Sequence, residues 1–261
     1  MHDQLHRWGW DKEWTQLYRS AAAPDLLPGR VIRHVHHIYD VVAAPGGDTL
    51  RTTIAGAFEY RAASPTDFPT AGDWVLFDRE GGRIQEVLPR RSAVSRNVAG
   101  RETVEQIIVA NVDILLLIFG LDGGRNFTEG MLERSLLAAY NSGATPMVVL
   151  NKSDCSDEEH LGEVLRQVEG GAPGTDCRVV SARTGAGLGE LRSMLAPGKT
   201  VGMLGKSGVG KSAILNALSR EGLGGPPAAL GAPSAATDAP PVLAREGKQR
   251  RGDRQGRHTT T

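Results

Sequence analysis

The sequence predicts an all-β OB-fold barrel followed by an α/β P-loop domain. Two observations lead to this fold class. Short β-like runs separated by turn residues fill residues 29–89, whereas from Glu105 onward continuous apolar runs alternate with helical patterns. A Gly-rich phosphate-loop motif then stands between a strand pattern and a helix pattern, which marks the α/β part as a nucleotide-binding domain.

Length and composition allow two domains and exclude several classes of protein. The 261 residues fit one large or two ordinary domains. Thirty Lys and Arg balance thirty Asp and Glu, so any basic surface for nucleic acid must be local. Cys155 and Cys177 are too few for a disulfide framework or a four-cysteine zinc site. Without a long apolar run or a signal-peptide pattern, we expect a cytoplasmic chain with no membrane partner.

Residues 1–28 are expected to form a helical extension. Trp10, Trp14 and Tyr18 recur at intervals of four residues, which is the spacing of one helix face. Packing of this aromatic stripe against the next domain is favoured over the alternative, which is stacking on nucleic-acid bases.

Residues 29–95 are expected to form the barrel. Four or five short strands are too few for a large sandwich and fit a small closed barrel of the OB kind, which often binds oligonucleotides on one face. The first expected strand, RVIRHVHHIYDVV, carries His34, His36 and His37, and places His34 and His36 on one face. A solvated or RNA-facing strand is favoured there over a metal site, because no further ligands follow at suitable spacing.

Residues 105–261 have the pattern of an α/β domain. VDILLLIF and TPMVVL are continuous apolar runs typical of buried parallel strands, and CRVVSA and TVGML are shorter strand candidates. Helical patterns lie among these runs, in FTEGMLERSLLAAYNSG, EEHLGEVLRQV and GLGELRSML. This alternation predicts a parallel sheet with crossover connections.

The strongest motif is a P-loop between the strand pattern TVGML and the helix pattern SAILNALS. Backbone N–H groups of such a loop surround phosphates, and the following helix N-terminus favours negative charge. Lys211 would reach the β and γ phosphates, and the Ser212 hydroxyl would coordinate Mg²⁺. A chance Gly-rich turn does not explain the strand, the helix, the lysine and the serine together. The motif consists of Gly205, Lys206, Ser207, Gly208, Val209, Gly210, Lys211 and Ser212.

Asn151-Lys152-Ser153-Asp154 follows the strand TPMVVL and favours guanine as the base. The Asp154 carboxylate can accept the N1 and N2 protons of guanine, which adenine does not offer. The Asn151 amide can hold the base and the neighbouring loop, and the Lys152 stem can cover the base face. The alternative is a helix cap, in which Asp154 or Ser156 starts a helix at Asp157. In the presence of a P-loop the guanine interpretation is favoured, which predicts GTP and GDP as ligands.

Ser181-Ala182-Arg183 after CRVV resembles the third guanine loop, whose backbone meets the base oxygen.

The order of the motifs is unusual. In Ras-like GTPases the P-loop comes first, whereas here the segments at 151 and 181 precede the P-loop at 205. This order predicts a circularly permuted GTPase, a rearrangement that is tolerated because the termini of compact domains often lie close together.

The chain resembles the circularly permuted bacterial ribosome small subunit-dependent GTPase A family. The resemblance runs from about Gly29 to Thr261 through PGRVIR, FPTAGDWV, RRSAVSRNVAGRETVEQIIVANVDILL, NKSD, SAR, GKSGVGKSAILNAL and GRHTT. It implies an OB barrel, a permuted G domain and a C-terminal zinc-binding domain. It also implies a GTPase that acts late in small-subunit assembly, with the small ribosomal subunit and its rRNA as partners and that subunit as stimulator. We expect the chain to be a monomer.

The resemblance also assigns roles in the C-terminal segment. Gly256-Arg257-His258-Thr259-Thr260 resembles the family's first switch. His258 is then the candidate for orienting or deprotonating the attacking water, and Thr259 is favoured over Thr260 as the Mg²⁺ ligand. Without the resemblance, a disordered basic terminus would be favoured.

Residues 221–247 are expected to form a mobile insertion, because Gly, Ala and Pro make up 15 of the 21 residues from 221 to 241.

The sequence stops at Thr261, before the DxxG switch and the cysteines and histidines of a zinc domain. We therefore expect a C-terminally truncated G domain that lacks zinc ligands.

Two functions stay open. In the first, the chain is a GTPase that docks on rRNA through the barrel and a basic junction. In the second, it is a non-catalytic RNA-binding OB module with a hydrolysis-deficient G domain. The junction arginines are Arg90, Arg91, Arg96 and Arg101.

Overall fold

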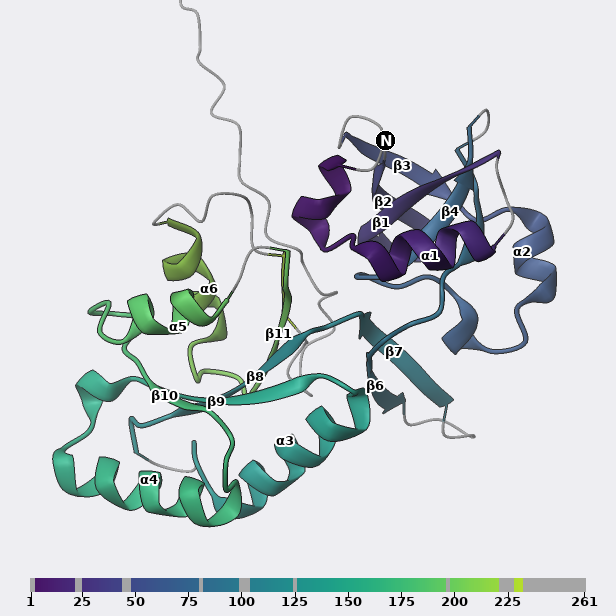
Figure 1. Ribbon diagram of the computed structural model, residues 1–261. Helices are drawn as coiled ribbons and strands as arrows, with labels where there is room; N and C mark the ends of the chain where they lie inside the picture. Colours follow the sequence, from purple (N-terminus) through teal and green to yellow (C-terminus); the bar gives the residue numbers. More distant parts are fainter. Residues whose placement is uncertain are drawn as a thin grey trace, which may run out of the picture.

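An antiparallel barrel and a parallel sheet, joined by a hairpin, organise the protein (Figure 1). The computed structural model describes residues 3–21, 25–43, 48–79, 82–98, 104–123, 126–195, 198–220 and 228–231. Among these residues, no helix is both long and apolar enough to cross a bilayer.

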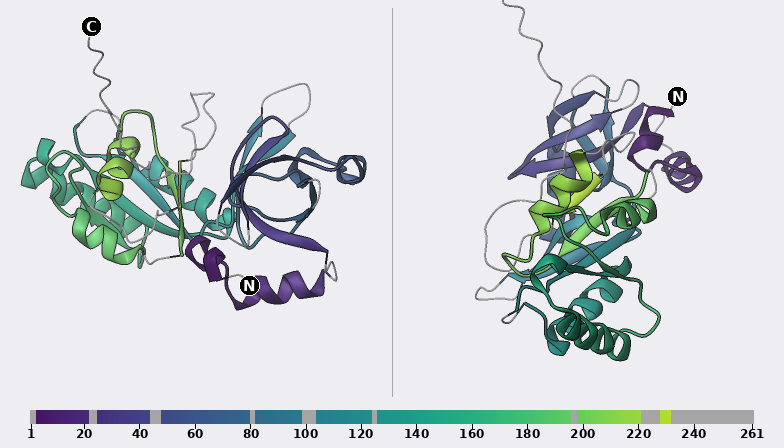
Figure 2. Two further views of the ribbon diagram at one scale, coloured as in Figure 1. Left: turned by 90° about the horizontal axis from the view of Figure 1, so that it is seen from above. Right: turned by 90° about the vertical axis from the view of Figure 1, so that its left-hand side faces the viewer.

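The barrel contains strands in the order β3-β2-β1-β4-β5, and each neighbouring pair is antiparallel. A parallel bridge joins Ile54, the residue after β3, to Ile84 in β5, and the N–H of Ala55 donates to the Ile84 carbonyl at 2.8 Å. The strands curve around a common apolar interior (Figure 2). The strands are β1 (Leu26–Val35), β2 (Ile38–Ala43), β3 (Thr49–Thr53), β4 (Trp74–Asp78) and β5 (Ile84–Val87).

Two local expectations for the barrel were wrong. The run expected as one strand is a hairpin, in which His36, at φ +52°, and His37 form the turn between β1 and β2, so His36 does not share a strand face with His34. Within residues 29–89, where the sequence predicts short β-like runs, β3 is followed by a helix, α2 (Gly56–Arg61). Ala55 at its N-cap has no capping side chain, so the usual sequence signal for a helix start is missing. In addition, β1 begins at Leu26, so the expected boundary at Gly29 falls inside a strand.

The N-terminal segment packs on the barrel through its aromatic residues, as their spacing predicts. It comprises η1 (Asp3–Trp8) and α1 (Lys12–Ser20), which is capped by Asp11. Trp10 and Trp14 are buried, with ring centroids 4.8 Å and 6.0 Å from that of Trp74 in β4. These rings lie inside the protein, so they are not a surface for base stacking.

The second sheet is parallel throughout, with strand order β10-β9-β8-β11-β12. Helices α3 and α4 cover one face, and α5 and α6 cover the other (Figure 1). Burial on both faces explains why the central strand is apolar at consecutive positions. The elements are β8 (Ile114–Gly120), α3 (Glu129–Ser142), β9 (Thr145–Asn151), η3 (Ser153–Cys155), α4 (Glu158–Gly171), β10 (Cys177–Val179), α5 (Leu188–Met194), β11 (Thr200–Leu204), α6 (Lys211–Arg220) and β12 (Ala228–Gly231).

Strand β12 lies within residues 221–247, where the composition predicts only a mobile insertion. It pairs in parallel with β11 from Thr200↔Ala228 to Met203↔Gly231. A parallel ladder is made by backbone groups, so the short segment Ala-Ala-Leu-Gly can form it although the composition of the region carries no strand signal. The remainder of this expected insertion lies outside the described residues.

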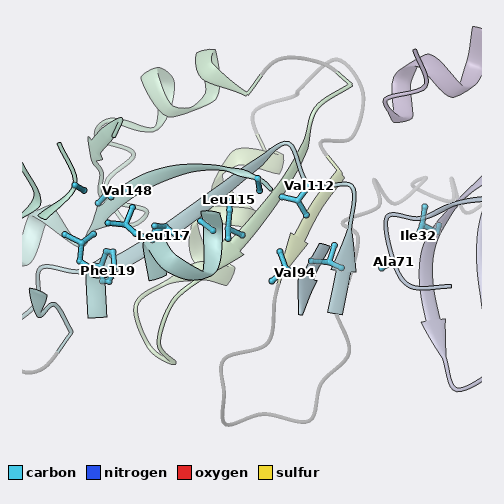
Figure 3. Close-up of a cluster of buried hydrophobic side chains, with 14 of the residues drawn as sticks. Ile32, Ala71, Val94, Val112, Leu115, Leu117, Phe119 and Val148 are labelled. Carbon is cyan, nitrogen blue, oxygen red and sulfur yellow. The ribbon is translucent and has the colours of Figure 1, made fainter. Parts of the chain in front are cut away.

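A hairpin of β6 (Ala93–Val98) and β7 (Val104–Ala110) lies between the two sheets. The expected barrel end at residue 95 therefore falls inside β6, and β7 is not part of the parallel sheet. One apolar cluster continues from the sheet through this junction to the barrel (Figure 3). It includes Phe119, Leu117, Leu115, Val112, Val94, Ala71 and Ile32.

The guanidinium of Arg30 is a buried link among four segments. Arg30 is 3% exposed, and its Nη2 donates to the Thr200 hydroxyl at 2.7 Å and to the Asn111 carbonyl at 3.3 Å. Its Nε donates to the Gly72 carbonyl at 3.3 Å, and Nη1 donates to the Trp8 carbonyl. Burial lowers the pKa of Arg30 to about 10, so the side chain stays charged at neutral pH.

Replacing Arg30 by Met should destabilise the fold, because the methionine fills part of the space but removes a hydrogen bond from each of the four oxygen acceptors, although the Gly72 carbonyl keeps a second bond, from Nδ2 of Asn111 at 3.1 Å. We expect the free energy of unfolding to fall by about 3 kcal/mol. Urea unfolding followed by tryptophan fluorescence measures it. The matched control is Arg33→Met on the same strand, where the side chain is exposed and little change is expected. Equal stability of the two variants would contradict the linking role of Arg30.

Candidate nucleotide-binding site

Three loops meet where parallel strands end. Asn151-Lys152-Ser153-Asp154 begins with the last residue of β9, Ser181-Ala182-Arg183 follows β10, and Gly205–Gly210 follows β11 and leads into α6. Because the strands are parallel, their carboxyl ends lie at one edge of the sheet, which is where open α/β sheets bind ligands. The structure therefore brings together the segments that the sequence singles out.

The side-chain amide of Asn151 connects all three loops. Asn151 is 2% exposed, and its Nδ2 donates to the Val209 carbonyl in the P-loop at 2.8 Å. Its Oδ1 accepts from the Ala182 backbone N–H at 3.1 Å. Both ends of a buried amide are thus satisfied, and one side chain contacts all three loops.

Asp154 presents an ionised carboxylate beside the third loop. One carboxylate oxygen accepts from the Ser181 hydroxyl, and the other forms an ion pair with Arg183. The hydrogen bond from Ser181 is the main reason why the pKa of Asp154 is lowered. The alternative of a helix cap at Asp154 or Ser156 is wrong, because α4 begins at Glu158 and its N-cap is Asp157, which accepts from the His160 N–H at 2.8 Å.

Lys152 is held by a residue that the sequence does not single out. The backbone of Lys152 is left-handed, at φ +67°, and its Nζ lies 2.5 Å from Oδ2 of Asp122. Asp122 follows β8, and its Oδ1 accepts from Nδ2 of Asn126 at 2.9 Å. The proximity arises because β8 and β9 are neighbours in the sheet, and no motif in the sequence carries this information.

The P-loop has a buried anchor and an exposed rim. Val209 is fully buried, whereas Lys206, Ser207 and Gly208 are exposed. The Lys211 ammonium donates to the carbonyls of Gly205 at 2.7 Å and Lys206 at 3.0 Å. Burial lowers the pKa of Lys211. An anion in the loop would offer this ammonium a charged partner in place of two carbonyls.

Ser212 is exposed in the first turn of α6 and offers one hydroxyl oxygen. One protein oxygen fits Mg²⁺, which usually completes its coordination with waters and substrate phosphates. Among the residues that the structure describes, no group of three or more His, Cys, Asp or Glu side chains is arranged to hold a metal ion. His258 and Thr259 lie outside the described residues, so their roles stay predictions.

The arginines of the junction have structural partners. Arg90 binds the buried Asp73 carboxylate, with Nε to Oδ1 at 2.8 Å and Nη2 to Oδ2 at 2.7 Å. Arg91 pairs with Asp11 at 2.7 Å and with Glu13 at 3.0 Å. Arg90 and Arg91 are therefore paired with carboxylates within the fold, and docking of the junction on rRNA stays a prediction. Arg96 contacts Gln106, and Arg101 lies outside the described residues.

Residues 87–261 match the family model described as RsgA GTPase. The chain is 38% identical over 221 residues to the small ribosomal subunit biogenesis GTPase RsgA of Syntrophotalea carbinolica, which covers 81% of this chain and 59% of the relative. It is 35% identical over 263 residues to the protein of that name from Streptomyces coelicolor, covering 100% of this chain and 64% of the relative. The chain thus spans less than two thirds of the length of these relatives.

Two solved structures share the fold. The crystal structure of YjeQ from Thermotoga maritima superposes with a TM-score of 0.61 at 27% identity, covering 76% of this chain and 66% of that chain. The crystal structure of YloQ, described as a circularly permuted GTPase, superposes with a TM-score of 0.56 at 22% identity, covering 73% of this chain and 63% of that chain. The second likeness concerns the fold alone. The circularly permuted GTPase fold that the motif order predicts is confirmed.

Substitution of Gly210 tests the contact between the P-loop and Asn151. Gly210 and Gly208 both have positive φ, at +99° and +85°. A Cβ atom on Gly210 would lie 2.2 Å from Nδ2 of Asn151, whereas one on Gly208 would meet nothing within 4 Å. In the absence of nucleotide, Gly210→Ala should lower the free energy of unfolding by about 1–2 kcal/mol more than Gly208→Ala, because only the former also disrupts the Asn151 hydrogen bonds.

Urea unfolding of both variants beside the wild-type chain gives this difference. An equal loss in the two variants would mean that backbone strain alone accounts for the glycine at 210.

Proposed function

Because the chain belongs to the RsgA GTPase family, we propose that it binds GTP, hydrolyses it to GDP and takes part in assembly of the small ribosomal subunit. The observation that carries the proposal is the buried Asn151 amide, which joins the P-loop to both guanine loops. A phosphate loop alone accepts any nucleoside triphosphate. Because the Asn151 amide places the phosphate loop close to the Asp154 loop, the site favours a guanine nucleotide.

Base recognition is assigned to Asp154 and the loop at Ser181-Ala182. A carboxylate has about four acceptor sites on its two oxygens, so Asp154 can keep the Ser181 hydroxyl and still accept guanine N1–H and N2–H. Arg183 is largely exposed, at 71% of its side chain, and can move aside when the base enters. Lys152 would lie along the base face.

Phosphate binding is assigned to residues 205–212. The backbone N–H groups of the loop and the N-terminus of α6 favour an anion there. Lys211 would exchange the carbonyls of Gly205 and Lys206 for the β and γ phosphates. Ser212 would hold Mg²⁺, which neutralises charge on the phosphates when bound. For hydrolysis we propose His258 as the group that orients or deprotonates the water, and Thr259 as a second ligand of Mg²⁺, both from the family resemblance.

Contact with rRNA is assigned to the barrel, for which we propose the OB type. The parallel bridge that closes the five antiparallel strands supports this topology. At the tip of the β1–β2 hairpin, residues 35–38 are exposed, with Val35 at 41% and Ile38 at 49%. His36 and His37 stand between them, and histidine rings can stack on unpaired bases. We propose that the protein acts as a monomer in the cytoplasm, where ribosomes assemble.

The variant Asp154→Asn should shift nucleotide preference from GTP toward xanthosine triphosphate, because the amide can donate to the xanthine carbonyl. We expect GTP binding to weaken by about tenfold or more, with XTP binding gained. Titration with fluorescent nucleotides measures both affinities. Lys211→Ala is the control, because it should weaken both triphosphates without changing the preference. Unchanged GTP affinity in Asp154→Asn would remove Asp154 from the base site.

Cosedimentation with purified small ribosomal subunits tests the assembly role. We expect the chain to pellet with small subunits when a non-hydrolysable GTP analogue is present and to remain in the supernatant with GDP. GTP turnover, measured with and without subunits, separates the two functional alternatives. RNA binding without nucleotide dependence or turnover would favour a non-catalytic RNA-binding module over the GTPase.

A further inference from the structure

We propose that Asp122 is a positioning residue of the guanine site, which anchors the Lys152 ammonium so that the lysine stem lies ready to cover the base. The inference rests on the proposed binding of GTP and adds a residue from a fourth loop, the one after β8. In the structure the contact is direct, with Nζ of Lys152 at 2.5 Å from Oδ2 of Asp122.

The backbone of Lys152 is fixed independently of its side chain. The residue sits in a left-handed conformation, at φ +67°, which residues other than Gly, Asn and Asp seldom adopt. The loop is tied on one side by the Leu121 N–H, which donates to the Asn151 carbonyl at 2.8 Å. On the other side, the Ser153 N–H donates to the Val180 carbonyl at 3.1 Å. The Cα of Lys152 thus has a set position, and only its long side chain needs orientation.

The far end of that side chain is fixed by Asp122, which is itself held. Its second oxygen, Oδ1, accepts from Nδ2 of Asn126 at 2.9 Å. The side chains of Asp122 and Lys152 are each 27% exposed, so their ion pair is partly shielded from water. The hydrogen bond from the Lys152 ammonium and that from Asn126 also lower the pKa of Asp122, so both contacts favour its ionised form.

Gly120 makes room for this arrangement. A Cβ atom at Gly120 would lie 2.6 Å from Oδ1 of Asp122 and 3.3 Å from Cβ of Asn126. The missing side chain lets the Asp122 carboxylate fold back over the end of β8. Gly120 is also paired in register with Asn151, the first residue of the guanine motif. The position of Asp122 is therefore set by the same strand pairing that sets the motif.

An anchored ammonium lowers the conformational-entropy cost of binding a base. A free lysine side chain loses considerable rotamer freedom when it is laid along a flat surface. When Asp122 holds the charged end, the methylene stem is already ordered between two fixed points, and less freedom is lost on binding. The stem would contact the base and not the phosphates, so the contribution should be equal for GTP and GDP.

The test is Asp122→Ala in the full chain, with binding of GTP and GDP measured by fluorescent-nucleotide titration. We expect both affinities to fall by about fivefold. The matched control is Asp176→Ala, which removes a carboxylate from an exposed ion pair with Arg178 in the same domain. That variant should bind both nucleotides as the wild-type chain does.

A double-mutant cycle separates positioning from a merely structural effect. Lys152→Met keeps a long apolar stem but has no ammonium, so Asp122→Ala should cause no further loss in that background. An equal fivefold loss there, a loss for GTP but not GDP, or unchanged affinity in Asp122→Ala would each overturn the proposal. If the wild-type chain binds no GTP, the proposed function fails as well. If the wild-type chain binds GTP and only Asp122→Ala has no effect, this inference alone fails.

Discussion

The buried guanidinium of Arg30 is the contact on which the arrangement of the whole chain depends. Its acceptors come from the N-terminal segment, the barrel, the junction and the first residue of β11, which are represented by Trp8, Gly72, Asn111 and Thr200. All four acceptors are neutral, and the nearby Asp113 and Asp73 carboxylates add coulombic stabilisation, so the buried charge is best stabilised when the segments converge. Because β11 leads directly into the P-loop, the barrel and the nucleotide site share one anchor.

Two further buried polar groups repeat this principle at smaller scale. Asp73 is fully buried and accepts both a bidentate contact from Arg90 and the Thr70 N–H, which ties the end of the barrel to the loop before β4. Asn151 does the same for the three nucleotide loops. Each group would be costly to bury alone, so its presence requires that several loops be correctly placed at once. The proposed site is therefore cross-linked by buried hydrogen bonds where the loops meet and exposed at Lys206, Ser207 and Gly208.

Much of the α/β part and of the site was predictable because its signals are local. A strand buried on both faces must be apolar at consecutive positions, as in residues 114–119, and a phosphate loop needs its glycines, Lys211 and Ser212 within one short segment. The barrel was less predictable. The sequence from Arg30 to Val42 has no Gly, Pro, Asn or Asp-Gly turn signal, so it does not predict the left-handed turn at His36. Helix α2 likewise starts without a capping side chain, so its start was not predicted either.

The sequence by itself determined the nucleotide loops, their permuted order and the apolar strands, since each is written in a contiguous run of residues. Only the tertiary structure decided what distant charges do. It placed Asp122 beside Lys152 through the pairing of β8 with β9, and it placed Arg90 and Arg91 on buried or neighbouring carboxylates rather than on a free basic surface. The physical reason is that the role of a charged side chain depends on its partners and on its burial. Strand order and domain packing bring those partners together from positions that are far apart in the sequence, and no short motif records them.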